Sequence, residues 1–89
     1  MSEKNFTVIN RLGLHARPAA LFVNTTNKFK SSVKVHKGEQ EVDGKSIMGL
    51  MMLAAEEGST LRIVVIGPDE KEVLSSLDKL FADRFGEKD

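Results

Sequence analysis

The stretch GLHARPAALFVNTT, residues 13–26, marks a change from a bend to a helix. Gly13 suits the bend, and Pro18 is tolerated in a first helical turn, where its missing N–H has no intrahelical partner. From about Ala16, apolar residues recur at the three- and four-residue spacing of an amphipathic helix. They are Ala19, Phe22, Val23 and Phe29, and Thr26 lies in the same stripe. His15 is therefore expected at or just before the N-cap.

A short strand is predicted before this helix, in NFTVIN at residues 5–10. Phe6 and Val8 alternate with Thr7 and Ile9 there, as the two faces of a strand do. The bend that carries the histidine therefore joins a strand to a helix.

Two more strands are predicted in SSVKVHKGEQEVDGKS, residues 31–46. Val33 and Val35 point one way, and Lys34 and His36 point the other. The turn KGEQ between the strands contains a glycine that can take a positive φ, so we expect a hairpin. We assign no functional role to the second histidine of the chain, which lies on this hairpin.

The second half of the chain predicts a helix, a strand and a helix. IMGLMMLAAEEG, residues 47–58, predicts a short helix that Ser46 caps and its final glycine closes. TLRIVVIG, residues 60–67, is nearly continuous in aliphatic residues and suits a central strand. GPDEKE opens the last helix, with Asp69 as N-cap and Glu72 in capping-box spacing. The apolar stripe of that helix is Val73, Leu74, Leu77, Leu80 and Phe81.

The order β-α-β-β-α-β-α predicts an α+β fold, an open-faced β-sandwich. We expect a four-stranded, mainly antiparallel sheet with three helices on one face. The length suits one domain over residues 1–89. The first residues lack an apolar signal segment and no apolar run is long enough to span a bilayer, so we expect a cytoplasmic protein without membrane insertion.

Composition narrows the classes of function. Lys and Arg total 13, as do Asp and Glu, and neither Trp nor Tyr is present, which argues against a nucleic-acid partner. The chain has no cysteine and only two histidines, so we expect no metal site. Paired carboxylates and nucleophile triads are missing from the pattern, so we expect neither a cofactor nor an enzyme with turnover on a small molecule.

The start of the first helix is a candidate phosphate site. The backbone N–H groups of Ala16 and Arg17, the positive helix end and the Arg17 guanidinium would surround an anion beside His15. The same positive end disfavours a charged imidazole, and a neutral imidazole is a nucleophile. A phosphoramidate on imidazole is labile, so such a group can be accepted and passed on. The plainer alternatives are that His15 is only a cap or loop residue and that Arg17 is a solvated side chain.

The helix predicted at residues 47–58 carries two apolar arcs, at about 3.6 residues per turn. The first arc is Leu50, Leu53 and Ala54. The second arc is Ile47, Met48 and Met51. A short helix on a sheet cannot bury both, so we expect the second arc to stay exposed as a docking surface for several partners. The alternative is that all six side chains are core, with methionines filling gaps.

Ser46 has two interpretations. As the residue before the helix, it can serve as the N-cap alone. As a phosphorylation site, it would carry a phosphate that the helix dipole favours and that need not unfold the helix. That charge would lie beside the second arc and weaken docking.

GLHARPA at residues 13–19, followed by KSIMGLMML at residues 45–53, resembles the HPr family. These are the histidine-containing phosphocarriers of the bacterial phosphoenolpyruvate-dependent phosphotransferase system. The resemblance covers essentially the whole chain and implies a carrier that takes a phosphoryl group from Enzyme I and passes it to the A domains of Enzymes II. The branch it serves is either sugar uptake or nitrogen regulation. HPr kinase/phosphorylase and transcriptional regulators are further implied partners, and we expect a monomer that presents one surface to each partner in turn.

The resemblance also implies a role for each matched residue. His15 matches the histidine that is phosphorylated on Nδ1, and Arg17 matches the arginine that contacts the phosphoryl group. Ser46 matches the serine that an ATP-dependent HPr kinase phosphorylates in many members. The family's apolar partner patch corresponds to Ala20, Ile47, Met48 and Met51. A regulatory binding module without histidine chemistry is the alternative from another class, and a small RNA-binding α+β domain is a more distant one.

Overall fold

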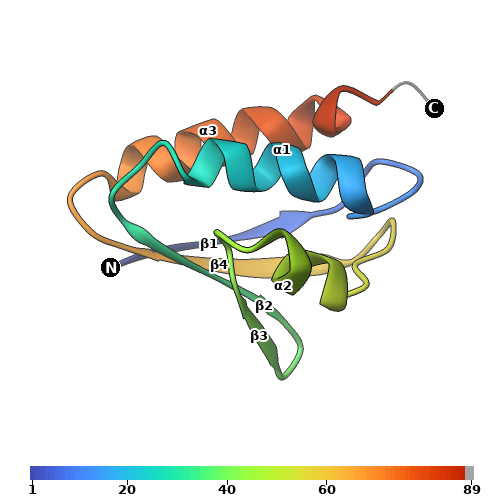
Figure 1. The fold of residues 1–89 in the computed structure, drawn as a ribbon, viewed down its shortest axis with the longest axis horizontal. Coiled ribbons are helices and arrows are strands. Elements are labelled where there is room, and N and C mark those ends of the chain that lie inside the picture. The colour runs from blue at the N-terminus through green and yellow to red at the C-terminus, as the bar shows by residue number, and fades with distance from the viewer. Residues whose placement is uncertain (88–89) are drawn as a thin grey trace.

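The computed structural model describes residues 1–87 and shows a four-stranded antiparallel sheet covered by helices on one face (Figure 1). In chain order the elements are β1 (Ser2–Thr7), α1 (Ala16–Thr26), β2 (Ser32–Lys37), β3 (Gln40–Asp43), α2 (Ile47–Met52), β4 (Thr60–Ile66), α3 (Glu70–Ala82) and the 3-10 turn η1 (Arg84–Gly86). The predicted order of elements and the open-faced sandwich are confirmed. The last two residues of the predicted 1–89 span, Lys88 and Asp89, lie outside the described residues. No helix within residues 1–87 is long and apolar enough to cross a membrane.

The strands lie in the order β1-β4-β2-β3, and every neighbouring pair is antiparallel. β4 is central, as its run of aliphatic residues predicted, and it pairs with both β1 and β2. Alternate residues of these strands face the helices, because side chains along a strand point to opposite faces in turn. The buried set is Phe6, Val33, Val35, Leu61, Ile63 and Val65.

The core is completed by the predicted apolar stripes of the two long helices. α1 buries Ala19, Phe22 and Val23, and α3 buries Val73, Leu77 and Phe81. The Phe81 ring lies 4.8 Å from the Phe6 ring and 6.2 Å from the Phe22 ring, between centroids, so it joins both helices to the edge strand. Each buried Val, Leu or Phe side chain of this set contributes about 1.5–3 kcal/mol.

β1 begins and ends three residues earlier than the predicted span of 5–10. Its partner β4 reaches far enough to pair Ser2 with Val65. Beyond Thr7 the chain leaves the sheet ladder, and the Val8 N–H donates to the carbonyl of Ser59 in the loop before β4, at 2.9 Å. The alternation of apolar residues therefore predicted the faces of this strand correctly and its limits wrongly.

α2 ends at Met52, six residues before the predicted end. Ala54 takes a φ of 50°, which stops the helix. The next carbonyl, that of Ala55, accepts a hydrogen bond from the Leu14 N–H at 2.9 Å. A tertiary bond to the histidine loop thus replaces the last predicted helical turn, and Gly58 closes a turn before β4 instead of a helix.

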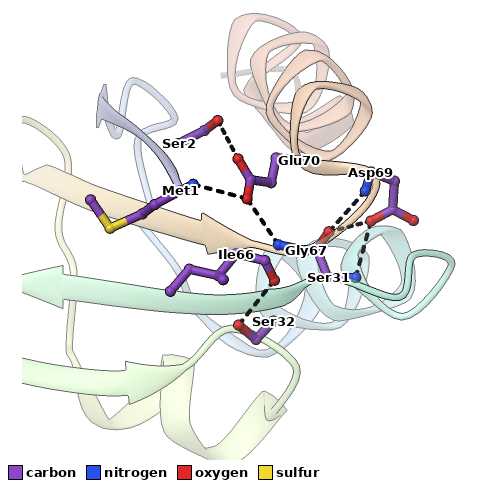
Figure 2. Close-up of polar contacts among 8 residues, drawn as sticks. All are labelled: Met1, Ser2, Ser31, Ser32, Ile66, Gly67, Asp69 and Glu70. Atoms are coloured by element: carbon purple, nitrogen blue, oxygen red, sulfur yellow. Dashed lines mark hydrogen bonds and ion pairs between the residues drawn. The ribbon is translucent and has the colours of Figure 1, made fainter.

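The corner where α3 begins differs from the predicted capping box, and Figure 2 shows it. Asp69 is the N-cap residue but makes no side-chain cap hydrogen bond. Its carboxylate accepts hydrogen bonds from the Lys30 N–H and the Ser31 N–H, both at 3.0 Å, and from the Ser31 hydroxyl. These bonds lower the pKa of Asp69, and the bond from the Ser31 hydroxyl has the largest effect. Asp69 therefore ties the α1–β2 loop to α3, and Glu72 forms no box with it.

Glu70 makes the second set of bonds at this corner (Figure 2). Its carboxylate accepts hydrogen bonds from the Ser2 hydroxyl at 2.6 Å and the Gly67 N–H at 2.9 Å, and it lies 3.2 Å from the ammonium group of Met1. These contacts lower the pKa of Glu70 to about 2, and the hydrogen bond from the Ser2 hydroxyl has the largest effect. The corner thereby joins the start of β1 to the start of α3.

Candidate phosphoryl-acceptor site

His15 is the N-cap residue of α1, with extended backbone angles of −78° and −170°. Its side chain is 39% exposed and makes no cap hydrogen bond, so the geometry does not favour the alternative that the ring serves as a cap. The first intrahelical hydrogen bond runs from the Ala19 N–H to the His15 carbonyl at 3.0 Å. The N–H groups of Ala16 and Arg17 precede that bond, and both residues are exposed. Backbone donors at a helix start suit an anion.

A carboxylate that the sequence analysis missed lies against the His15 ring. Glu87 places Oε2 2.6 Å from His15 Nε2. Its other oxygen, Oε1, accepts a hydrogen bond from Asn10 Nδ2 at 2.9 Å. Asn10 is fully buried, and the same Nδ2 donates to the Gly13 carbonyl at 2.7 Å. The C-terminal segment and the β1–α1 loop therefore meet at the ring.

Glu87 is held in its ionised form. The hydrogen bond from Asn10 lowers the pKa of Glu87 most, and the hydrogen bond to His15 and the charges of His15 and Arg17 lower it further, against the effect of burial. A carboxylate beside Nε2 favours a proton on that nitrogen.

The 3-10 turn η1 brings Glu87 back to the ring. Arg84 and Phe85 both have a φ of 54°, and Gly86 has a φ of 74°, so the chain reverses directly after α3. Phe85 is buried, and its ring lies 4.9 Å from that of Phe81, between centroids. The sequence carries a signal for this turn, because Phe85 continues the apolar stripe four residues after Phe81 and a glycine follows.

The predicted exposed arc is exposed in the structure. Met48 is 68% exposed, and Ile47, Met51 and Met52 are also open to solvent. The opposite arc was predicted to be Leu50, Leu53 and Ala54, of which only the two leucines are buried. Ala54 is exposed because it lies beyond the end of α2. Ala20, the fourth residue of the predicted patch, is half-buried on α1.

A hollow of about 250 Å³ connects this arc to the histidine. Its lining residues are Leu12, Leu14, His15, Met51, Ala54, Ala55 and Glu56. Leu12 is exposed on the turn before the histidine and faces the same hollow as Met51. The ring and the apolar arc of α2 therefore lie on one continuous surface.

Ser46 is confirmed as the N-cap of α2. Its Oγ accepts a hydrogen bond from the Gly49 N–H at 3.0 Å, and the residue is half-buried. Phosphorylation of Ser46 stays a prediction.

The other histidine, His36, pairs with Glu41 across the β2–β3 hairpin at 3.5 Å. Within residues 1–87, no three His, Asp or Glu side chains form a group that could hold a metal ion.

Comparisons with known proteins identify the family. The family described as "PTS HPr component phosphorylation site" matches residues 2–83. The chain belongs to the HPr family. The phosphocarrier protein HPr of Cupriavidus necator is 48% identical over 87 residues, covering 98% of each chain. The HPr-like protein Crh of Halalkalibacterium halodurans is 47% identical over 77 residues, covering 86% of this chain and 92% of its own.

A solved HPr structure has the same fold. The crystal structure of HPr-C-His from Thermoanaerobacter tengcongensis superimposes with a TM-score of 0.94 at 43% identity and covers 99% of both chains. Membership of the HPr family makes this chain a phosphocarrier of the phosphotransferase system, a carrier rather than an enzyme with its own turnover.

Proposed function

We propose that this chain accepts a phosphoryl group on His15 from phosphorylated Enzyme I and passes it to the A domains of Enzymes II. Phosphoenolpyruvate is the ultimate donor, and the branch is sugar uptake or nitrogen regulation. The observation that carries the proposal is the placement of His15, an exposed ring at a helix start beside an exposed apolar arc. One domain of this size, acting as a monomer in the cytoplasm, can bind Enzyme I and an Enzyme II A domain one after the other.

The residues around the ring have separate roles in this proposal. His15 is the nucleophile, and the N–H groups of Ala16 and Arg17 stabilise the charge of the phosphoryl group. The Arg17 guanidinium offers further donors to its oxygens. The protonated ring is a good leaving group, so the phosphoryl group can move on to the next protein. No metal or cofactor takes part.

The surface that binds both partners comprises Ala20, Ile47, Met48 and Met51. Methionines are flexible and polarizable, so one patch can fit several partner surfaces. The patch is continuous with the hollow beside His15. Docking there would place the partner's reactive group next to the ring.

Ser46 is the proposed regulatory site, with HPr kinase/phosphorylase as the modifying partner. Ser46 immediately precedes the exposed arc of α2, so a phosphate on its hydroxyl would add negative charge beside that arc.

A second candidate function is a binding module that binds transcriptional regulators without histidine chemistry. The similarity to an HPr-like protein Crh favours keeping this candidate, and the two functions can coexist.

Intact mass spectrometry after mixing with phosphoenolpyruvate and Enzyme I tests the proposal. We expect a mass gain of one phosphoryl group that brief acid treatment removes, because phosphohistidine is acid-labile. His15→Ala should fold normally and gain nothing. A persistent gain in His15→Ala would place the modification elsewhere, and no gain in the parent chain would favour the binding module.

A further inference from the structure

The two nitrogens of the His15 ring lie in different surroundings. Nε2 is 2.6 Å from Glu87 Oε2, a distance typical of a charge-assisted hydrogen bond. An ionised carboxylate only accepts hydrogen bonds, so the shared hydrogen belongs to Nε2. When the ring carries a single proton, its lone pair is then on Nδ1.

Asn10 holds the other oxygen of the same carboxylate. Its Nδ2 donates to Glu87 Oε1 at 2.9 Å and to the Gly13 carbonyl at 2.7 Å. Both neighbours are acceptors, so only the NH₂ group can face them, which fixes the orientation of the amide. Within residues 1–87 the buried Asn10 Oδ1 has no hydrogen-bond partner. The structure therefore requires the NH₂ group of Asn10 as a hydrogen-bond donor, and an ionised aspartate has no such donor.

The loop that carries Asn10 is fixed to its surroundings. The Gly13 N–H donates to the Asn10 carbonyl at 3.2 Å, which closes a tight turn before the histidine. Gly13 has a φ of 70°, and a Cβ there would lie 3.0 Å from Glu56 Cα. Asn10 is therefore tied to the turn that leads into His15, and Glu87 contacts the side chains of both residues.

We propose that Asn10 and Glu87 are positioning residues that keep a proton on His15 Nε2 and thereby direct the phosphoryl group to Nδ1. The proposal rests on the proposed phosphoryl transfer at His15. As the bond from phosphorus to Nδ1 forms, the bond from phosphorus to the donor protein breaks, and its electron pair stays with the donor. The proton on Nε2 remains, so the ring becomes a cation. Glu87 lies directly against that new charge.

The ¹⁵N chemical shifts of the His15 ring test this directly. At alkaline pH, where the ring carries one proton, the parent chain should show that proton on Nε2. Glu87→Ala should give a mixture of both tautomers and slow the phosphorylation by Enzyme I about 10-fold, as loss of a supporting contact does. Its unfolding midpoint should stay unchanged. Glu72→Ala removes the same charge from an exposed site in the first turn of α3 and should alter neither the shifts nor the rate.

A double-mutant cycle tests whether Asn10 acts through Glu87. The pair Asn10→Ala and Glu87→Ala should be no slower than Glu87→Ala alone. Glu87 lies outside the helices and strands, so its variant decides the matter even where Asn10→Ala fails to fold. Unchanged ¹⁵N shifts in Glu87→Ala, or altered shifts with an unchanged rate, would overturn the proposal. A parent chain that gains no phosphoryl group would instead overturn the proposed function.

Discussion

Two carboxylates near opposite ends of α3 are held in similar ways but by different kinds of partner. Glu70, at the start of the helix, accepts hydrogen bonds from the Ser2 hydroxyl and the Gly67 N–H (Figure 2). Glu87, beyond the end of the helix, accepts one from Asn10 and contacts the His15 ring. The pKa of each lies below the ordinary value, that of Glu70 at about 2.

The difference lies in what each end leaves unpaired. At the corner, hydroxyl, backbone and terminal groups satisfy one another and join β1, the α1–β2 loop and α3. At the other end, Asn10 Oδ1 is buried without a partner within residues 1–87, and methionines face solvent. Unpaired buried polar groups and exposed apolar side chains are expected at functional sites more than in purely structural regions. Corner variants should therefore change stability, and variants at the histidine end should change transfer and docking.

Gly67→Ala should cause the largest loss of stability. Gly67 has a φ of 152°, and a Cβ there would lie 2.5 Å from Ser31 Cα. We expect the free energy of unfolding in urea to fall by about 3 kcal/mol, with phosphorylation of the folded fraction unchanged. Gly58→Ala is the matched control, because its φ is 91° but nothing lies near the added Cβ, and it should lose about 1 kcal/mol. Equal losses would show that contact with Ser31 is not what requires glycine.

Met48→Asp should separate docking from stability. The side chain is mostly solvent-exposed, so the free energy of unfolding should change by less than about 0.5 kcal/mol. Binding of Enzyme I or an A domain should weaken about 30-fold, or about 2 kcal/mol, because a charge would enter an apolar contact. Titration calorimetry with Met48→Leu as control measures this. An unchanged affinity would remove Met48 from the docking surface.

Two substitutions at Ser46 should separate its two roles. Ser46→Ala removes the acceptor of the Gly49 N–H and should lower the free energy of unfolding by about 1 kcal/mol. Ser46→Asp keeps a cap acceptor, so it should retain most of that stability while its charge slows phosphoryl exchange with partners. If stopped-flow exchange rates are the same for both variants, Ser46 is a helix cap only.

Acid should weaken the corner in a defined pH range. The folded-state pKa of Glu70, about 2, lies below the ordinary value of 4.5, so its contribution to stability is present above that value and is lost as pH falls toward 2. Glu70→Gln should therefore flatten the dependence of the urea midpoint on pH in this range. Glu72→Gln, at an exposed neighbouring position, is the control. A parent-like slope in Glu70→Gln would contradict the assigned role of the corner.

Local signals in the sequence predicted much of the histidine end. The proline in the first turn of α1 located His15 at its N-cap, and the second arc of α2 correctly predicted that Ile47, Met48 and Met51 stay exposed. The serine before α2 was predicted as its cap, and the structure confirms it. These features depend on residues within a turn or two of each other, which is the range over which capping and periodicity operate.

Contacts between distant residues were not predicted, because periodicity carries no information on them. Asp69 bonds to the α1–β2 loop instead of capping α3, and the bond from Leu14 to Ala55 ends α2 early. The contact of Glu87 with His15 joins residues 72 positions apart and depends on a chain reversal in left-handed backbone after α3. The sequence showed only a phenylalanine and a glycine at that reversal.

A pulse-chase measurement tests the central claim most directly. The chain is labelled with radioactive phosphoenolpyruvate and Enzyme I, freed of both, and then mixed with an Enzyme II A domain. The account predicts that the label moves from this chain to the A domain, and that His15→Ala neither takes up nor delivers any. Label that enters the parent chain but stays there, or label that enters His15→Ala, would contradict a carrier acting through His15.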